Sequence, residues 1–253
     1  PGSKKISGLS TCGRVRRVAA ILARMTTNHW LPRQKKTKQV DTLTIGGTAA
    51  NGQVYTVTIG QKAIAYTATV TDTNSTIASS LKTSLAASTE PEFDEITWTV
   101  SGAVITGTAD NAGKPFTPTT TGTGTGTFVT AISTANTSPN DVNDGKNWSA
   151  GTVPASTEDV YIDETDISLL WNLDALSAIT LTSLNVGQSF TGDIGLSEYH
   201  DGNDDYPEYR AQYWQIGVTT GLVGYGPGSG SGRIKLNCGS VSGTWTILAT
   251  GGS

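Results

Sequence analysis

The chain has 253 residues, of which 36% are hydrophobic and 15% charged, and it contains 30 Gly, two Cys and one Met. This length allows one large or two modest domains, each with enough apolar residues for a core. No run approaches the ~18 consecutive apolar residues of a membrane-spanning helix, so no membrane partner is expected. Cys12 and Cys238 lie too far apart to indicate a disulfide framework or a zinc site. Abundant Gly, Ser, Thr and Val favour β-structure with polar turns.

The charge is divided unevenly along the sequence. Residues 1–40 hold ten of the 17 Lys and Arg and no acid, whereas residues 41–253 hold all 21 Asp and Glu. A basic arm of this kind could attract polyanions. The alternative is that Met25 is a natural start and residues 1–24 are upstream sequence outside the fold. We follow the alternative and expect residues 1–39 to be a basic, disordered or non-native segment, with no nucleic-acid partner.

Residues 40–135 are expected to form a small ββαββ module of the α+β class. Runs that alternate apolar and polar residues predict strands, with Gly at their joints. Apolar residues at three- and four-residue spacing predict one amphipathic helix over 73–88, capped by Asp72 or Asn74. The Thr- and Gly-rich stretch 119–127 is either a strand edge or a flexible loop. The predicted strands, of which the first three form a meander, cover residues 42–45, 54–59, 64–70, 95–100 and 103–108.

Three short motifs mark this module. They are Tyr-Thr-x-Thr at residues 66–69, Asp-Thr-x-x-x-Ile-Ala at 72–78 and Ala-Gly-x-Pro-Phe at 112–116. With them, residues 40–130 resemble a small α+β module that recurs in structural proteins of tailed phages and in some bacterial surface proteins. The resemblance implies a building block of an assembly on a virion or a cell surface. It transfers no catalytic residues.

Residues 136–158 are expected to be a linker and a cap. Trp148 should plug the end of the domain that follows, because a buried aromatic covers about 150–250 Å² and a β-stack needs a cover at its end. The segment from Asn147 to Ile162 resembles the entry to right-handed parallel β-helices of phage and bacterial secreted proteins.

Residues 159–253 show apolar pairs at repeat-like intervals. The interval from Val160 to Ile179 is nearly the same as the interval from Ile216 to Ile234. This spacing predicts coils of about 20 residues, as in a parallel β-helix or another solenoid. A β-sandwich is the alternative architecture. No polar closing element follows the last predicted strand, so this domain is expected to be truncated at its C-terminus.

Acidic and aromatic residues concentrate between residues 198 and 210. Asp201, Asn203 and Asp205 alternate as oxygen donors, as at the start of a calcium loop. The pattern is incomplete, because Tyr206 replaces the Gly of the sixth position and Gln212 the Glu of the twelfth. Calcium is therefore one hypothesis and an ordinary solvated loop the other, and no other cofactor is expected.

The same stretch could bind a carbohydrate. Tyr199, Tyr206 and Tyr209 could stack on sugar rings, and Arg210 could donate hydrogen bonds to them. The neighbouring acids could supply general acid–base catalysis, as in a polysaccharide lyase or glycosidase built on a β-helix. The alternative is that the aromatic residues pack the loop onto its domain and Arg210 pairs with a nearby acid.

The chain lacks the common catalytic motifs, namely Gly-x-Ser-x-Gly, His-Glu-x-x-His and Cys-x-x-Cys. We therefore expect a mainly β, non-enzymatic structural protein of a phage virion or a bacterial cell surface, which assembles with its own copies or with other structural proteins. A carbohydrate-active enzyme and a calcium-stabilised adhesin are the alternatives.

Overall fold

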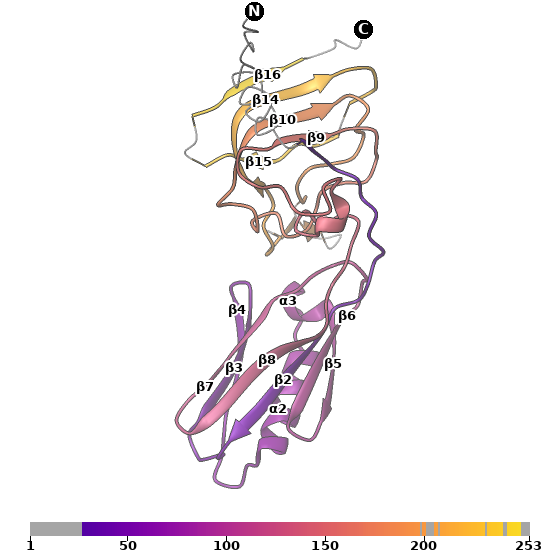
Figure 1. Ribbon diagram of the computed structural model, residues 1–253. Helices are drawn as coiled ribbons and strands as arrows, with labels where there is room; N and C mark the ends of the chain where they lie inside the picture. Colours follow the sequence, from indigo (N-terminus) through magenta and orange to yellow (C-terminus); the bar gives the residue numbers. More distant parts are fainter. Residues whose placement is uncertain are drawn as a thin grey trace, which may run out of the picture.

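The computed structural model describes residues 27–197, 199–200, 205–206, 208–230, 232–239 and 242–248. It is mainly β and consists of two modules, each with its own hydrophobic core (Figure 1). The first core lies in a module that we call the stacked module, which contains residues 27–31 and most of the chain after residue 137. The second core lies in a small module, which is formed by the chain between these two parts of the stacked module. Its core residues run from Leu43 to Phe128.

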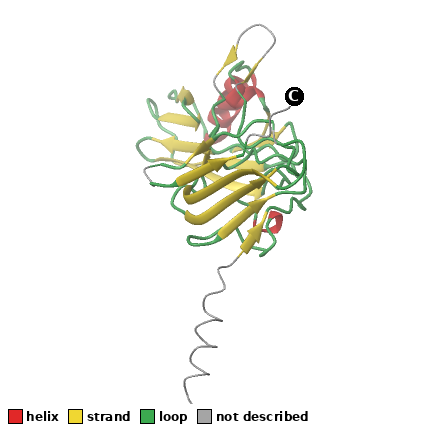
Figure 2. Ribbon diagram, turned by 90° about the horizontal axis from the view of Figure 1, so that it is seen from above, coloured by secondary structure: helices red, strands yellow, loops and turns green. Residues whose placement is uncertain are grey.

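A parallel sheet forms one side of the stacked module. Within the described residues it has the strand order β1-β9-β10-β14-β16, and Figure 2 shows these strands side by side. Every pair of neighbouring strands in the sheet is parallel, so the alternative of an antiparallel β-sandwich is wrong. The strands are β1 (Thr27–His29), β9 (Asp159–Ile162), β10 (Thr180–Gly187), β14 (Gly217–Tyr225) and β16 (Thr244–Ile247).

The chain returns to this sheet at longer intervals than the sequence predicted. Val160 pairs with Leu184 and not with Ile179, and the interval from Gly221 to its partner Trp245 is as long. Between β10 and β14 the interval is longer still, because the segment that includes residues 198–210 is inserted there. The second expected interval also fails, since Ile234 bridges to Ile194 and not to Ile216. Both expected intervals are therefore wrong.

Two further parallel ladders lie on other sides of the stacked module. Leu169, Ile194 and Ile234 form one through isolated bridges. The other pairs β13 (Trp214–Gln215) with β15 (Leu236–Asn237), and Gln215 also donates its N–H to the carbonyl of Leu173. Successive passes of the chain therefore stack on one another at three places around one core.

Residues 27–39 differ from the expected basic, disordered or non-native segment. Thr27–His29 form β1, which pairs in parallel with β9, and Trp30 is fully buried in the core of the stacked module. The segment then runs into the small module (Figure 1). The small module is thus inserted between the first and second strands of the parallel sheet. Residues 1–26 lie outside the described part.

Trp148 is buried at one end of the stack, where the sequence predicted a plug. Its ring is 1% exposed and lies 5.0 Å from that of Trp30, and its indole N–H donates to the carbonyl of Val142. The segment around it also pairs with the outer side of β1, because Ser149 donates its N–H to the carbonyl of His29 at 2.9 Å. We call this side of the sheet the closed end. The short helix η1 (Gly145–Asn147) leads into it.

The small module contains two antiparallel sheets with a helix packed against both (Figure 1). One has the strand order β5-β6-β2-β8 and the other β4-β3-β7. The expected meander is wrong, because the first predicted strand pairs in a different sheet from the next two. The Thr- and Gly-rich stretch forms most of β7, the turn after it and the start of β8, and these two strands belong to different sheets. The strands are β2 (Val40–Gly47), β3 (Val54–Ile59), β4 (Lys62–Thr67), β5 (Ile96–Ser101), β6 (Val104–Ala109), β7 (Pro118–Gly122) and β8 (Gly126–Thr134).

The predicted helix is confirmed as α2 (Asn74–Ala86). Its cap is Thr73, which forms a capping box with Thr76, and not Asp72 or Asn74. Asp72 instead accepts hydrogen bonds from Thr69, Thr76 and the hydroxyl of Tyr66 just before the helix. A short helix, α3 (Pro91–Asp94), follows and buries Phe93.

Candidate functional site

The structure places the predicted site residues in two groups. Asp201 and Asn203 lie outside the described residues. Tyr199, Asp205 and Tyr206 belong to the short antiparallel pair β11 (Tyr199–His200) and β12 (Asp205–Tyr206), of which the backbone is described. The calcium hypothesis and this part of the carbohydrate hypothesis therefore stay predictions. Over the described residues, no group of three His, Cys, Asp or Glu could hold a metal ion.

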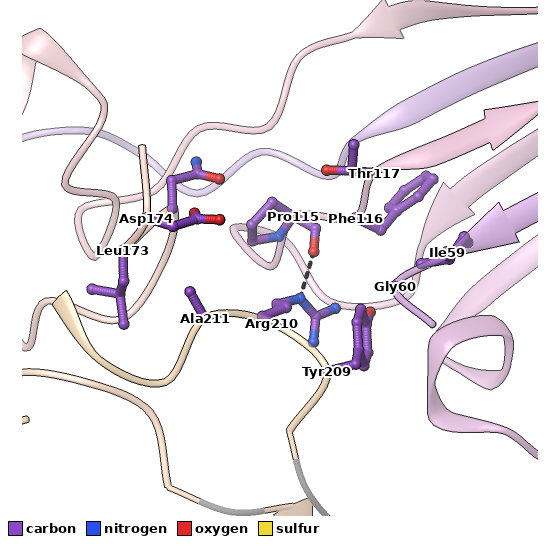
Figure 3. Close-up of a pocket in the computed structure, with 11 residues that line it drawn as sticks. Ile59, Gly60, Pro115, Phe116, Thr117, Leu173, Asp174, Tyr209, Arg210 and Ala211 are labelled. Carbon is purple, nitrogen blue, oxygen red and sulfur yellow. Dashed lines mark hydrogen bonds between the residues drawn. The ribbon is translucent and has the colours of Figure 1, made fainter. Parts of the chain in front are cut away.

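Tyr209 and Arg210 lie at the junction of the two modules (Figure 3). The guanidinium of Arg210 donates from Nε to the carbonyl of Pro115 at 2.7 Å and from Nη2 to Glu95 at 2.7 Å. Its Nη1 donates to Glu208 at 2.9 Å. Arg210 therefore belongs to the stacked module but takes two of these three partners from the small module.

Aromatic rings flank the same guanidinium. Its carbon lies 4.1 Å from the centroid of the Tyr209 ring and 5.7 Å from that of Trp171. The Tyr209 hydroxyl donates to Glu95 at 3.3 Å, and the ring covers Gly60 at the end of β3. A planar cation between π-faces gains from both charge and dispersion. We call Tyr209, Arg210, Glu208, Glu95 and Lys114 the junction cluster.

The charges of the junction cluster compensate one another. Glu95 pairs with both Arg210 and Lys114, and Glu208 pairs with Arg210. Burial alone would raise the pKa of Glu95, but the two cations and their hydrogen bonds lower it below its usual range. Burial also disfavours charge on Arg210, but the neighbouring acids hold its pKa above the ordinary value. Glu95 is therefore ionised, and both acids are engaged in the described geometry.

A small cavity of about 180 Å³ adjoins the cluster. It is smaller than the pockets of ~300–1,000 Å³ that bind most small ligands. Both carboxylates of the cluster are already paired, so neither is placed to act as a free acid or base. The alternative interpretation of Arg210, in which it pairs with a neighbouring acid, is confirmed. The loop packs onto the small module, however, and not only onto its own domain.

A second cavity at the junction holds two buried carboxyls. It has a volume of about 410 Å³, and Asp41 of β2 and Asp141 of the linker line it. Burial raises the pKa of both groups, although Gln39 donates to Asp41 and Asn172 donates to Asp141. These hydrogen bonds satisfy the carboxyls in part and tie each one to its own module.

The other candidate surface is the side of the parallel sheet opposite the closed end. Two ladders of inward side chains run across the sheet: Val160, Leu184, Gly221 and Trp245 in one, and Ile162, Val186, Val223 and Ile247 in the other. In the second ladder Ile162 is 0% exposed and Val186 1%, but Ile247 is 72% exposed. The ladder therefore ends on an uncovered apolar residue.

The ring of Trp245 packs directly against the backbone of Gly221, its partner on β14. A Cβ at Gly221 would collide with this ring. In the described part of the chain, β16 pairs with β14 alone, so its other backbone edge is unpaired. We call this surface the open end. Its cavity of about 670 Å³ is lined by Val223, Gly232, Ile234, Leu236, Cys238, Trp245 and Ile247, none of which is charged.

The partners of Arg210 and the open end were not predicted from the sequence. Glu95 and Lys114 lie far before Arg210 in the sequence, and no local pattern connects them. The open end carried a weak signal, because the alternation of Trp245 and Ile247 marked an apolar strand face.

Among the described helices, none is both long and apolar enough to cross a membrane. Neither a scan against protein-family models nor a search of curated proteins finds a match for this chain.

Proposed function

We propose that this chain is a non-enzymatic structural protein that acts by assembly through the open end of its stacked module. The observation that carries the proposal is the exposure of Ile247 in a ladder in which Ile162 and Val186 are buried and Val223 is half-buried. A contiguous apolar surface beside an unpaired strand edge is typical of an interaction site. A partner that adds a strand to β16 would bury both features at once.

The stacked module is best interpreted as coils of a parallel β-helix. Three parallel ladders surround one core, and the two coils without an insertion have equal length, from Val160 to Leu184 and from Gly221 to Trp245. In such an architecture each coil covers the apolar face of the coil before it. Two buried tryptophans, Trp30 and Trp148, cover the core at the closed end. At the open end, the apolar side chains that a further layer would cover line an open cavity.

The junction cluster supports a mechanical role for the protein. It joins the modules through a guanidinium with hydrogen bonds to both of them. A component of a large assembly must hold its modules in a fixed relative position. A buried charge pair favours one geometry, because any other arrangement leaves charges unpaired. The resemblance of residues 40–130 to modules of tailed-phage and bacterial surface proteins favours a virion or a cell surface as the location.

Light scattering coupled to size exclusion tests this proposal. The full chain should form a discrete assembly larger than a monomer across a concentration series, and Ile247→Asp should return it to a monomer, because the new charge would be buried in the interface. Thr220→Asp is the matched control. Thr220 is exposed on β14 and pairs with Thr244, so it lies one strand away from the free edge of β16, and this variant should assemble like the wild type. A wild type that stays monomeric throughout the series would contradict the proposal.

A further inference from the structure

The open end allows a more specific inference, which rests on the proposed function. We infer that the partner at the open end is a second copy of this chain, bound end to end about a two-fold axis with β16 against β16. The inference follows from the closed end, from the charges beside the open end and from the side-chain alternation of β16.

The closed end excludes head-to-tail stacking through the parallel sheet. The outer side of β1 is already occupied, because Leu31 donates its N–H to the carbonyl of Asn147 and His29 exchanges hydrogen bonds with Ser149. A copy arriving at β16 therefore finds no free β1 edge on its partner. The remaining arrangement is a contact between the open ends of two copies. Such a contact is isologous, because both copies use the same surface, and it closes at two copies.

The charges near the open end permit this contact. Its lining residues are uncharged, so two copies of the surface can meet without like-charge repulsion. Arg233 and Lys235, which alternate with lining residues in the sequence, are held on their own chain. Arg233 pairs with Asp193 at 3.3 Å, and the ammonium of Lys235 lies 5.4 Å from the centroid of the Tyr213 ring.

The alternation of side chains limits how the two strands can pair. A two-fold axis perpendicular to the sheet makes the two β16 strands antiparallel and keeps the same face inward in both copies. Residues opposite each other in an antiparallel pair share a face. Of the registers that this allows, the contact uses those in which Trp245 lies opposite Trp245 or Ile247 of the second copy. Both registers bury the Trp245 ring and the exposed Ile247 side chain in one continuous core.

Cysteine cross-linking of the full chain tests the inference. Cys12 and Cys238 are first replaced by Ser, and Thr246→Cys then places one thiol on the outer face of β16. In either register this thiol lies within two strand spacings, about 10 Å, of its counterpart. A short bismaleimide that spans this distance should give a product of twice the monomer mass.

Thr220→Cys in the same background is the matched control. Thr220 is exposed and lies on β14, one strand further from the open end, where it pairs with Thr244. Its counterpart in the second copy would be three strand spacings away, about 15 Å, which the reagent cannot span. The Thr246 product should be lost when Ile247→Asp is added, and it should form at least tenfold faster than any Thr220 product.

The outcomes separate the inference from the proposed function. No Thr246 product, in a chain that light scattering shows to be assembled, would overturn the two-fold contact and leave assembly standing. No product in a chain that is monomeric at every concentration would overturn both. Equal products from Thr246 and Thr220 would indicate random collision and would also overturn the inference.

Discussion

Replacing Arg210 by Met should loosen the joint between the two modules. Arg210 makes three side-chain hydrogen bonds, to Pro115, Glu95 and Glu208, with distances between 2.7 and 2.9 Å. Met keeps much of the aliphatic packing against the flanking rings but removes every side-chain donor. The variant therefore isolates the loss of the guanidinium.

The expected cost in the free energy of unfolding is about 3 kcal/mol. Removing one partner of a buried ion pair costs about 3–5 kcal/mol, because a buried charge is left uncompensated. Glu208 loses its cation, whereas Glu95 retains Lys114, so the lower end of this range applies. The side chains of Arg210 and Glu208 are 12% and 8% exposed, so water can replace little of what is lost.

Urea unfolding of the full chain measures this cost, with Arg233→Met as the matched control. Arg233 also pairs with an acid, Asp193, but both side chains are about one-third exposed, so its loss should cost less than about 1 kcal/mol. The pKa of Glu95 lies below its ordinary 4.5, so its contribution is full above pH 4.5 and is lost as the pH falls through the lowered pKa. A free energy of unfolding for Arg210→Met within about 1 kcal/mol of the wild type would refute this account of the junction.

Three other substitutions test the rest of the structure. Gly221→Ala should cost about 1–3 kcal/mol in urea unfolding, because its Cβ collides with Trp245; an unchanged stability would contradict the described ladder. Trp148→Ala should cost about 3–5 kcal/mol in the same assay, and a cost below about 1 kcal/mol would show that it does not close the stack. Asp41→Asn should raise the thermal midpoint at pH 7 and abolish the gain in stability that the wild type shows as the pH falls toward 3.8, because burial raises the pKa of Asp41 in the folded state; a lower midpoint at pH 7 would contradict this reasoning.

Local patterns in the sequence predicted the secondary structure of the small module well. The strand β3 has the predicted bounds, and α2 lies within the predicted helix, because alternation and helical spacing are properties of neighbouring residues. Sheet membership was less predictable. β2 pairs with β6 and β8 across the chain, and no local signal distinguishes that pairing from a meander with β3.

The register of the parallel sheet could not be read from apolar spacing. Val160 aligns with Leu184 and not with Ile179, because the turn from Ala175 to Ile179 lies outside the ladder. In the next strand Gly221 takes an inward position that an apolar pattern would assign to a larger residue. A glycine is needed there because the Trp245 ring fills the space that a Cβ would occupy.

The candidate sites were partly predictable. The sequence singled out Tyr209 and Arg210 because aromatic and charged residues cluster around them, and the pairing of Arg210 with an acid was one of the alternatives. Glu95 and Lys114 could not be assigned, since only the packing of the two modules brings them to Arg210.

Amide hydrogen exchange of β16 tests the central claim most directly. The full chain is compared at low and high protein concentration, and the amides of Thr244–Ile247 are followed together with those of β8, the edge strand of the small module. If the open end is the assembly surface, the amides of β16 should become more protected as assembly proceeds and those of β8 should not change. Protection that increases in β8 while β16 stays unchanged would contradict the claim.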